Sequence, residues 1–190
     1  MPRWDPDARA RLVAAALELF SERGYDSATV SEIAERAGLS RATFFRYFPD
    51  KREVLAAGQE TLSRELVAGI AEAPADATPL AAVRAGLARA SATMTPFHRA
   101  LGPGLLAVIA ASPELRARDT EKHAGLTAAA TEALRARGVA APVAALAAEL
   151  GALAFREAYA AWIAGDDGQD LGALSAAALD RLRDIAVRLD

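Results

Sequence analysis

Apolar residues recur at three- and four-residue intervals along most of the 190-residue chain, and no segment alternates as a half-buried strand would. Proline and glycine gather between these stretches, which is typical of breaks between helices, at 72–79, 102–104, 112–113, 138–142 and 165–170. The pattern therefore predicts an all-α fold. The expected helices span residues 7–23, 30–37, 41–48, 51–72, 80–95, 97–111, 114–137, 142–164 and 171–188.

Two short helices and a turn are expected within the segment 29–51. Thr29 and Glu32 have the spacing of a capping box, in which each side chain covers a backbone N–H of the other residue. Gly38 supplies the left-handed residue that ends the first helix. Ser40 caps the second helix by accepting a hydrogen bond from an early backbone N–H. Two capped helices with a short turn form a helix-turn-helix, which indicates nucleic-acid binding.

The second helix of this motif has distinct inner and outer faces. At about 100° per residue, Phe44 and Phe48 share one face and are expected in the core. The residues that point outward or to one side are small, hydroxyl-bearing, aromatic or basic: Ala42, Thr43, Phe45, Arg46 and Tyr47. Such a face suits insertion into a major groove about 12 Å wide.

Charge is distributed unevenly along the chain, whose formal net charge is −3. Between Arg36 and Arg52 there are five basic residues and one acidic residue, whereas the chain from Gln59 onward carries 13 basic and 16 acidic residues. The excess acidity thus lies away from the helix-turn-helix, and a phosphate-binding footprint can be local.

The motif is followed by a second capping-box spacing, between Asp50 and Glu53. We expect it to start a helix over 51–72, with Lys51 and Arg52 in the first turn, where cations and backbone N–H groups together can bind a phosphate. This helix would connect two domains and serve as a lever between them.

These residues resemble the N-terminal DNA-binding domain of TetR-family transcriptional regulators. The positions that carry the resemblance are Thr29, Ile33, Ala34, Ala37, Gly38, Leu39, Ser40, Ala42, Thr43, Phe45, Tyr47, Phe48 and Lys51. The resemblance extends over residues 9–55 and implies a three-helix DNA-binding domain at 1–50, a connecting helix at 51–72, and a C-terminal ligand-binding and dimerisation domain at 73–190.

The resemblance also implies individual contacts with double-stranded operator DNA. Thr29, Tyr47 and Lys51 would contact phosphates. The residues at or near base edges would be Ser40, Arg41, Ala42 and Thr43. Arg46 is added because of its outward angle, from which it can reach a phosphate or a base.

Three positions depart from the family pattern. Ala42 stands where the family usually has glycine, and its methyl group meets the DNA at a point of close approach. Phe45 replaces a tyrosine and therefore lacks a hydroxyl that family members often give to a phosphate. Tyr47 replaces a common histidine but can still donate through its hydroxyl.

The last two expected helices predict a homodimer. Leu146, Leu150 and Leu153 form one apolar stripe of 142–164, and a second stripe is displaced around the axis: Phe155, Tyr159, Trp162 and Ile163. A helix apolar on two sides must be covered on two sides. The final helix is amphipathic, with one apolar face: Leu174, Ala178, Leu182, Ile185 and Leu189. In TetR-like regulators such helices pair with their copies in a four-helix bundle; an intramolecular core is the alternative.

The middle of the chain is rich in alanine, leucine and valine, which predicts an apolar pocket for a small apolar or amphipathic effector. The candidate lining residues, for each of which core or surface is the alternative, are Met94, Phe97, His98, Leu101, His123, Phe155, Arg156, Tyr159 and Trp162. The two histidines lack metal-ligand spacing, and no cofactor or metal is expected.

Other features narrow the class of protein. The chain has no cysteine, no apolar signal-peptide core at its start and no apolar run of membrane-spanning length, so a soluble cytoplasmic protein is expected. It has no phosphate loop, nucleophile elbow or zinc-protease motif to indicate an enzyme. We therefore predict a ligand-responsive repressor that acts as a dimer on a near-palindromic operator. The alternative is a helical adaptor that has lost specific DNA binding.

Overall fold

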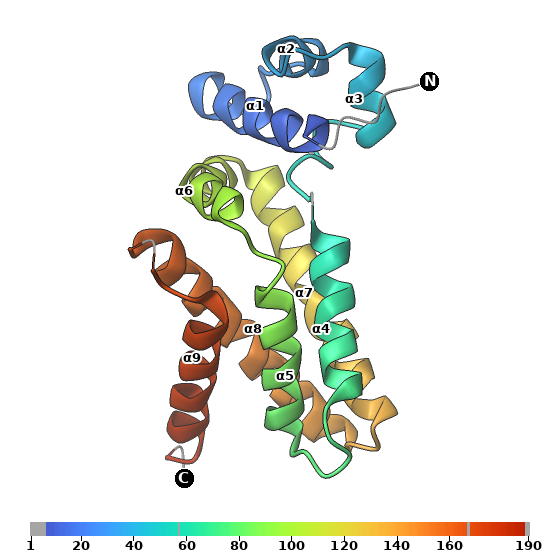
Figure 1. The fold of residues 1–190 in the computed structure, drawn as a ribbon, viewed down its shortest axis with the longest axis vertical. Helices are drawn as coiled ribbons and strands as arrows, with labels where there is room; N and C mark the ends of the chain where they lie inside the picture. Colours follow the sequence, from blue (N-terminus) through green and yellow to red (C-terminus); the bar gives the residue numbers. More distant parts are fainter. Residues whose placement is uncertain (1–6, 57, 167, 189–190) are drawn as a thin grey trace. The chain divides into compact units, whose positions relative to one another are not determined.

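The computed structural model describes residues 7–56, 58–166 and 168–188, and over these residues it contains nine helices and no strand, so the predicted all-α fold is confirmed (Figure 1). The helices are α1 (Ala8–Arg23), α2 (Val30–Arg36), α3 (Arg41–Tyr47), α4 (Gln59–Glu72), α5 (Pro79–Ser91), α6 (Pro96–Ala111), α7 (Pro113–Ala136), α8 (Ala141–Ala164) and α9 (Leu171–Ala186). In the described part of the chain, no helix is both long and apolar enough to cross a membrane.

Packing divides the chain into two units. The first contains the residues up to Gly58 together with Leu101–Arg118, and the second contains Gln59–Ala100 and the residues from Asp119 onward. This division differs from the expected domain boundaries at 50 and 73. The end of α6 and the start of α7 belong to the first unit, because Val108 and Leu115 are buried in the same apolar core as α1, α2 and α3.

The expected helix over 51–72 is wrong in its first part, since residues 51–56 form turns and α4 begins only at Gln59. The cap itself is present: Asp50 Oδ1 accepts hydrogen bonds from the backbone N–H of Arg52 (2.8 Å) and of Glu53 (3.2 Å). Gly58 has φ 93°, a left-handed conformation that interrupts a right-handed helix, so the lever proposed from sequence is shorter than expected.

The expected break at 102–104 is absent, because α6 runs through Pro103. Proline removes one N–H donor from the helix, but its fixed φ is helical. The usual clash with the preceding residue depends largely on that residue's Cβ, which Gly102 lacks. The Gly-Pro pair is therefore compatible with a continuous helix.

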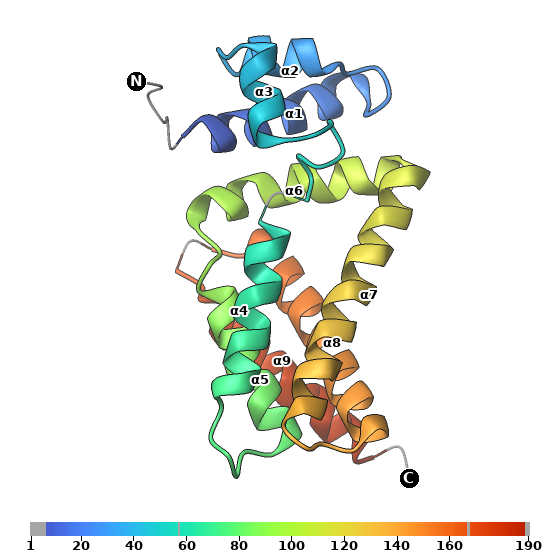
Figure 2. The same ribbon diagram turned by 90° about the vertical axis from the view of Figure 1, so that its right-hand side faces the viewer.

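The core of the first unit forms around α2, which packs against both α1 and α3 (Figure 2). Leu12, Ile33, Phe44 and Val54 are fully buried there. Phe48 is also buried, as the face of α3 predicted.

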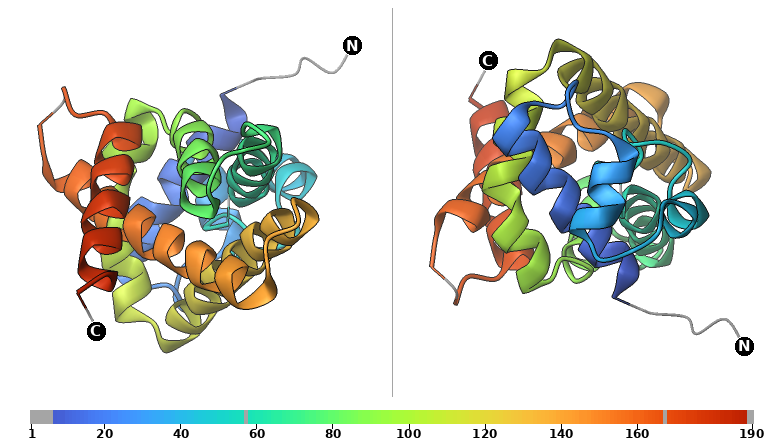
Figure 3. Two further views of the ribbon diagram at one scale, coloured as in Figure 1. Left: turned by 90° about the horizontal axis from the view of Figure 1, so that it is seen from below. Right: turned by 90° about the horizontal axis from the view of Figure 1, so that it is seen from above.

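The second unit contains helices that cross at close range. A Cβ on Gly69 of α4 would lie 2.7 Å from the Ala85 carbonyl oxygen, and one on Gly86 of α5 would lie 2.6 Å from the Leu66 carbonyl oxygen. Only glycine allows the two backbones to approach so closely. The helices α8 and α9 run beside each other (Figure 3).

The buried face of α8 is made almost entirely of small residues. It consists of Ala144, Ala147, Ala148, Gly151, Ala154, Ala158 and Trp162. Because the alanines face inward, the leucines of the helix lie on its other sides: Leu150 and Leu153 are partly buried and Leu146 is exposed.

Candidate nucleic-acid interface and ligand cavity

Both helices of the predicted helix-turn-helix are capped by side chains. The Glu32 backbone N–H donates to Thr29 Oγ1 (3.2 Å), and the Thr29 backbone N–H donates to Glu32 Oε2 (2.9 Å), which confirms the capping box. Ser40 Oγ accepts a hydrogen bond from the Thr43 backbone N–H at 3.1 Å. Gly38 has φ 67° and makes the turn between the helices, as predicted.

The cap occupies the hydroxyl of Thr29. This hydroxyl has one hydrogen, which it donates to Glu32 Oε2 at 2.8 Å. Hydrogen bonds from Thr29, followed by the charge of Arg23, hold the pKa of Glu32 below its usual value. The hydroxyl of Thr29 therefore has a capping role, and its phosphate contact, which would need this hydrogen, stays a prediction.

Ser40 and Thr43 share one hydrogen bond at the start of α3. Their hydroxyl oxygens lie 2.9 Å apart, so one hydroxyl donates to the other. The hydrogen of the accepting hydroxyl is left for another partner. The pair can therefore offer one hydroxyl hydrogen to a base edge.

The outward face of α3 carries basic and aromatic side chains. Arg41, Ala42 and Arg46 are exposed, and Phe45 is 45% exposed although it is wholly apolar. The guanidinium of Arg41 lies 5.4 Å from the centre of the Phe45 ring. In the same way, Arg46 lies 5.2 Å from the centre of the half-buried Tyr47 ring. Two arginines of the motif are thus each held against an aromatic face.

These two arginines differ from the other cations of the motif. Arg36 makes a two-pronged ion pair with Glu22, with both N–O distances at 2.8 Å, and Arg52 pairs with Asp50 at 2.6 Å. The bond from Arg36 is the main cause that lowers the pKa of Glu22. Among the residues that the structure describes, neither Arg41 nor Arg46 has an acidic partner, so their charge is the part of the motif that phosphates or bases can use.

Lys51 has a different position from the one expected. Its Nζ donates to the backbone carbonyls of Tyr25 (2.7 Å), Asp26 (3.1 Å) and Ala28 (3.1 Å). It also lies 4.4 Å from the centre of the Tyr25 ring. An ammonium group has three hydrogens, and all three are used within the protein. These bonds favour a structural role for Lys51, which ties the chain after α3 to the loop between α1 and α2, over the predicted phosphate contact.

The ring beneath this ammonium is itself held in the core. Tyr25 is buried and packs edge-on against Phe20, with ring centres 5.1 Å apart. Burial raises the pKa of Tyr25 to about 12. The tyrosine is neutral at physiological pH with or without this shift, and it gives Lys51 an uncharged, buried platform.

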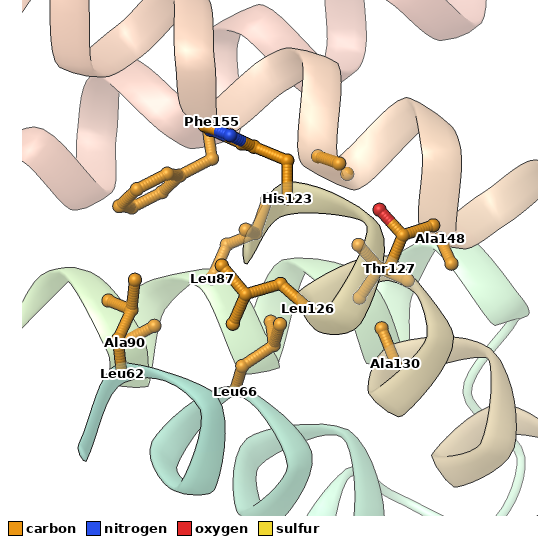
Figure 4. A pocket seen from close by; sticks show the side chains of 13 residues that line it. Leu62, Leu66, Leu87, Ala90, His123, Leu126, Thr127, Ala130, Ala148 and Phe155 are labelled. Carbon is orange, nitrogen blue, oxygen red and sulfur yellow. The ribbon is translucent and has the colours of Figure 1, made fainter. Parts of the chain in front are cut away.

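A narrow apolar cavity of about 40 Å³ lies within the second unit, between α4, α5, α7 and α8 (Figure 4). Its walls are leucine, alanine, valine and phenylalanine, with His123 and Thr127 as the polar side chains. The lining residues are Leu62, Leu66, Val83, Leu87, Ala90, His123, Leu126, Thr127, Ala130, Ala148, Gly151, Ala152 and Phe155.

Only His123 and Phe155 of the nine expected ligand-binding residues line this cavity. Met94, Tyr159 and Trp162 instead form an adjoining aromatic cluster, in which the Trp162 indole donates to the Gln169 carbonyl at 3.1 Å. The other four lie elsewhere: Phe97 and Arg156 are exposed, His98 bonds to Thr95, and Leu101 belongs to the first unit.

The residues that sequence reasoning missed are small or are ordinary core types. Gly151 lets α8 approach α5, because a Cβ there would lie 2.5 Å from Val83 Cγ1, and Ala152 lines the cavity with a single methyl group. The sequence feature that could have indicated them is the run of small residues at helical spacing along 144–158. In a chain so rich in alanine, this run is hard to distinguish from the general composition.

His123 is the polar group with the clearest geometry in the cavity wall. Its Nδ1 lies 2.7 Å from the Asp119 carbonyl oxygen. A carbonyl oxygen only accepts hydrogen bonds, so Nδ1 carries a hydrogen and donates it to this oxygen. Over the described residues, no group of three or more potential ligands is placed to bind a metal.

The short capped helices, the basic outward face of α3 and the buried face behind it define a helix-turn-helix DNA-binding protein. Residues 12–57 match the family described as bacterial regulatory proteins, tetR family. In this region the chain is similar to transcriptional regulators of the tetR family. Similar proteins include the HTH-type transcriptional regulator TcmR of Streptomyces glaucescens, 37% identical over 75 residues, which are 40% of this chain and 33% of that protein.

Sequence similarity to the curated relatives is thus confined to part of each protein. The alignments with the first three span 31–33% of those proteins' own lengths. Solved structures are similar over more of the chain. The SmeT–triclosan complex has a TM-score of 0.61 at 21% identity, covering 92% of this chain and 88% of that one, and it shows the fold.

A second similar structure is FadR of Thermus thermophilus, a TetR-family repressor in complex with lauroyl-CoA. Its TM-score is 0.51 at 26% identity, and the match covers 92% of each chain.

Proposed function

We propose that this chain is a ligand-responsive transcriptional repressor that binds a near-palindromic operator as a homodimer in the cytoplasm. The observation that carries the proposal is the face of α3, where Arg41 and Arg46 point outward without acidic partners in the described chain while Phe44 and Phe48 anchor the helix from behind. DNA contacts from Ser40, Ala42, Thr43, Phe45 and Tyr47 remain predictions of the same proposal.

A second copy of the chain is the partner that fits α8. Val143 and Leu146 are 49% and 60% exposed, and with Leu150 and Leu153 they repeat at the three- and four-residue intervals of a helix-packing seam. Val143, Leu146 and Leu150 border a groove of about 500 Å³ that also contains Leu80 of α5 and Leu179 of α9. Leu150 and Leu153 pack partly against this chain's own core, so Val143 and Leu146 are the side chains that a second protomer would cover.

Dimerisation fits the way a helix-turn-helix protein reads DNA. Two recognition helices enter successive major grooves when they stand about 34–36 Å apart. A two-fold dimer then favours a two-fold operator. An effector that changes this separation releases the DNA, because the two recognition helices can no longer bind their grooves at the same time.

The effector site is the cavity beside His123 and Phe155. A volume of about 40 Å³ holds only about three water molecules. Any larger apolar molecule must therefore displace side chains as it enters, which links occupancy to a change in shape. The FadR relative binds lauroyl-CoA and the SmeT neighbour binds triclosan, so both are suitable probes of an acyl chain and a compact aromatic effector.

The proposal is tested by an electrophoretic mobility shift on the DNA upstream of the protein's own gene, with the dimer confirmed by sedimentation. We expect a shift at low salt that weakens as salt rises. An inducer must bind the operator complex more weakly than the free protein, because coupling is reciprocal. A dimer that shifts no DNA at low salt would contradict the proposal and favour the adaptor alternative.

A further inference from the structure

We propose that Phe45 is a positioning residue that holds Arg41 in the geometry needed to read a guanine in the major groove. This inference rests on the proposed DNA-binding function and deepens it. It concerns the Arg41–Phe45 pair, defined as these two side chains on the outward face of α3.

Phe45 is the exposed one of the three phenylalanines in α3 and its C-cap. Phe44 and Phe48 are buried, whereas Phe45 is 45% exposed. An isolated exposed ring gains little from burial in the free protein. Phe45 instead lies on the same face of α3 as Arg41, because residues four apart are neighbours on a helix surface.

The ring is fixed from behind. Phe45 packs edge-on against Phe44, with ring centres 5.6 Å apart and an interplanar angle of 82°. Phe44 is wholly buried in the core of the first unit. A chain of contacts thus runs from the core through Phe45 to the Arg41 guanidinium, which lies 5.4 Å from the Phe45 ring centre.

An arginine that stacks its flat face on a ring keeps its recognition edge available. Contact with an aromatic ring uses the flat face or carbon atom of the guanidinium, whereas its five N–H donors lie in the plane. Two of these donors match the O6 and N7 acceptors of guanine, the commonest specific arginine contact in DNA. Limiting the motion of a flexible side chain before binding reduces the entropy lost when the contact forms.

Arg46 provides a natural comparison. It lies against Tyr47, the next residue in the chain, which is half-buried at the side of the helix. From that side it is placed for the phosphate backbone, which carries charge but no sequence information. The two arginines of α3 therefore have separate roles, base reading for Arg41 and phosphate binding for Arg46.

The test begins with selection of binding sites from a random-sequence duplex library by the full-length protein. Affinity for the selected duplex is then measured by fluorescence anisotropy for Arg41→Ala, Phe45→Leu, the double variant and Arg46→Ala. In a parallel duplex series, 7-deazaguanine replaces each guanine in turn and so removes its N7 acceptor. Phe45→Leu keeps the apolar bulk but lacks the ring face, and Phe45→Tyr keeps the ring.

We expect Arg41→Ala to lose about 5- to 150-fold in affinity and to lose the preference for one guanine per half-site. Phe45→Leu should lose about 2- to 5-fold at that same guanine. Phe45→Leu should have no further effect in the Arg41→Ala background, since its action passes through the arginine. Phe45→Tyr should retain the preference, and Arg46→Ala should weaken all duplexes alike.

Two results would overturn the inference while leaving the proposed function intact. One is that Phe45→Leu and Arg41→Ala multiply independently. The other is that Arg41→Ala weakens all duplexes equally and 7-deazaguanine has no effect on the wild-type protein, which would make Arg41 a phosphate contact. If the wild-type dimer selects no sequence at all, the proposed function fails and this inference fails with it.

Discussion

Replacing Lys51 with methionine removes the ammonium group and keeps most of the aliphatic stem. In the structure this ammonium donates to three carbonyls at 2.7, 3.1 and 3.1 Å and contacts the Tyr25 ring. A hydrogen bond to a charged group contributes about 1.5–3 kcal/mol, but these bonds are partly exposed to solvent and are not independent. We therefore expect a loss of about 2–4 kcal/mol in the free energy of unfolding.

Thermal denaturation and DNA binding together distinguish this role from a phosphate contact. At about 2–4 °C per kcal/mol for a chain of this size, Tm should fall by about 4–16 °C. The dependence of log K on log salt should stay unchanged below that Tm, because no phosphate is neutralised by Lys51. Each phosphate contact contributes about 0.9 to that slope, so a lost contact in both protomers would reduce it by about 1.8.

Arg46→Ala is the matched control, since it should reduce the salt slope and leave Tm nearly unchanged. The opposite pattern would refute the structural role of Lys51: a Lys51→Met variant with an unaltered Tm and a slope of log K against log salt that is reduced by about 1.8.

Three further predictions follow from the second unit. Gly69→Ala should lower the free energy of unfolding by about 1–3 kcal/mol, measured in urea, because its Cβ meets the backbone of α5. Gly125→Ala, a helical site with nothing within 4 Å, should raise it by about 0.5–1 kcal/mol, and equal effects at both sites would contradict the packing argument. Leu146→Glu should convert the dimer to a monomer in sedimentation and abolish operator binding. Leu106→Glu, at a leucine of the first unit that is also exposed, should leave the dimer intact; a dimeric Leu146→Glu variant would place the interface elsewhere. Ala152→Leu should fill the cavity, so that thermal stabilisation by lauroyl-CoA or triclosan is lost while operator binding remains; unchanged stabilisation by a probe that binds the wild type would exclude this cavity as its site.

Local patterns in the sequence predicted the helix-turn-helix well, because its determinants are close together in the chain. The capping box of Thr29 and Glu32 depends on residues three apart, and the burial of Phe44 and Phe48 follows from helical spacing. The outward direction of Arg41 follows from the same geometry.

Contacts between distant residues account for what the sequence did not predict. The carbonyl partners of Lys51 lie 23 to 26 residues earlier, so its first-turn position suggested a phosphate instead. The cavity is lined by Gly151 and Ala152, and Gly151 also lets α8 approach Val83 of α5, where a Cβ would lie 2.5 Å from Val83 Cγ1. Such packing between neighbouring helices has no signature in hydrophobic periodicity, which reports only which faces are buried.

The close crossing of α4 and α5 gives the cavity walls unequal stiffness. The backbones of α4 and α5 are in contact at Gly69 and Gly86. Arg89 of α5 also bonds to Glu65 (2.9 Å) and Glu72 of α4, so separating the two helices would break several interactions. A molecule that widens the cavity must therefore displace the opposite wall, formed by α7 and α8. Both walls continue along the chain into the first unit: α4 follows Gly58 directly, and the first turns of α7 are built into that unit's core through Leu115.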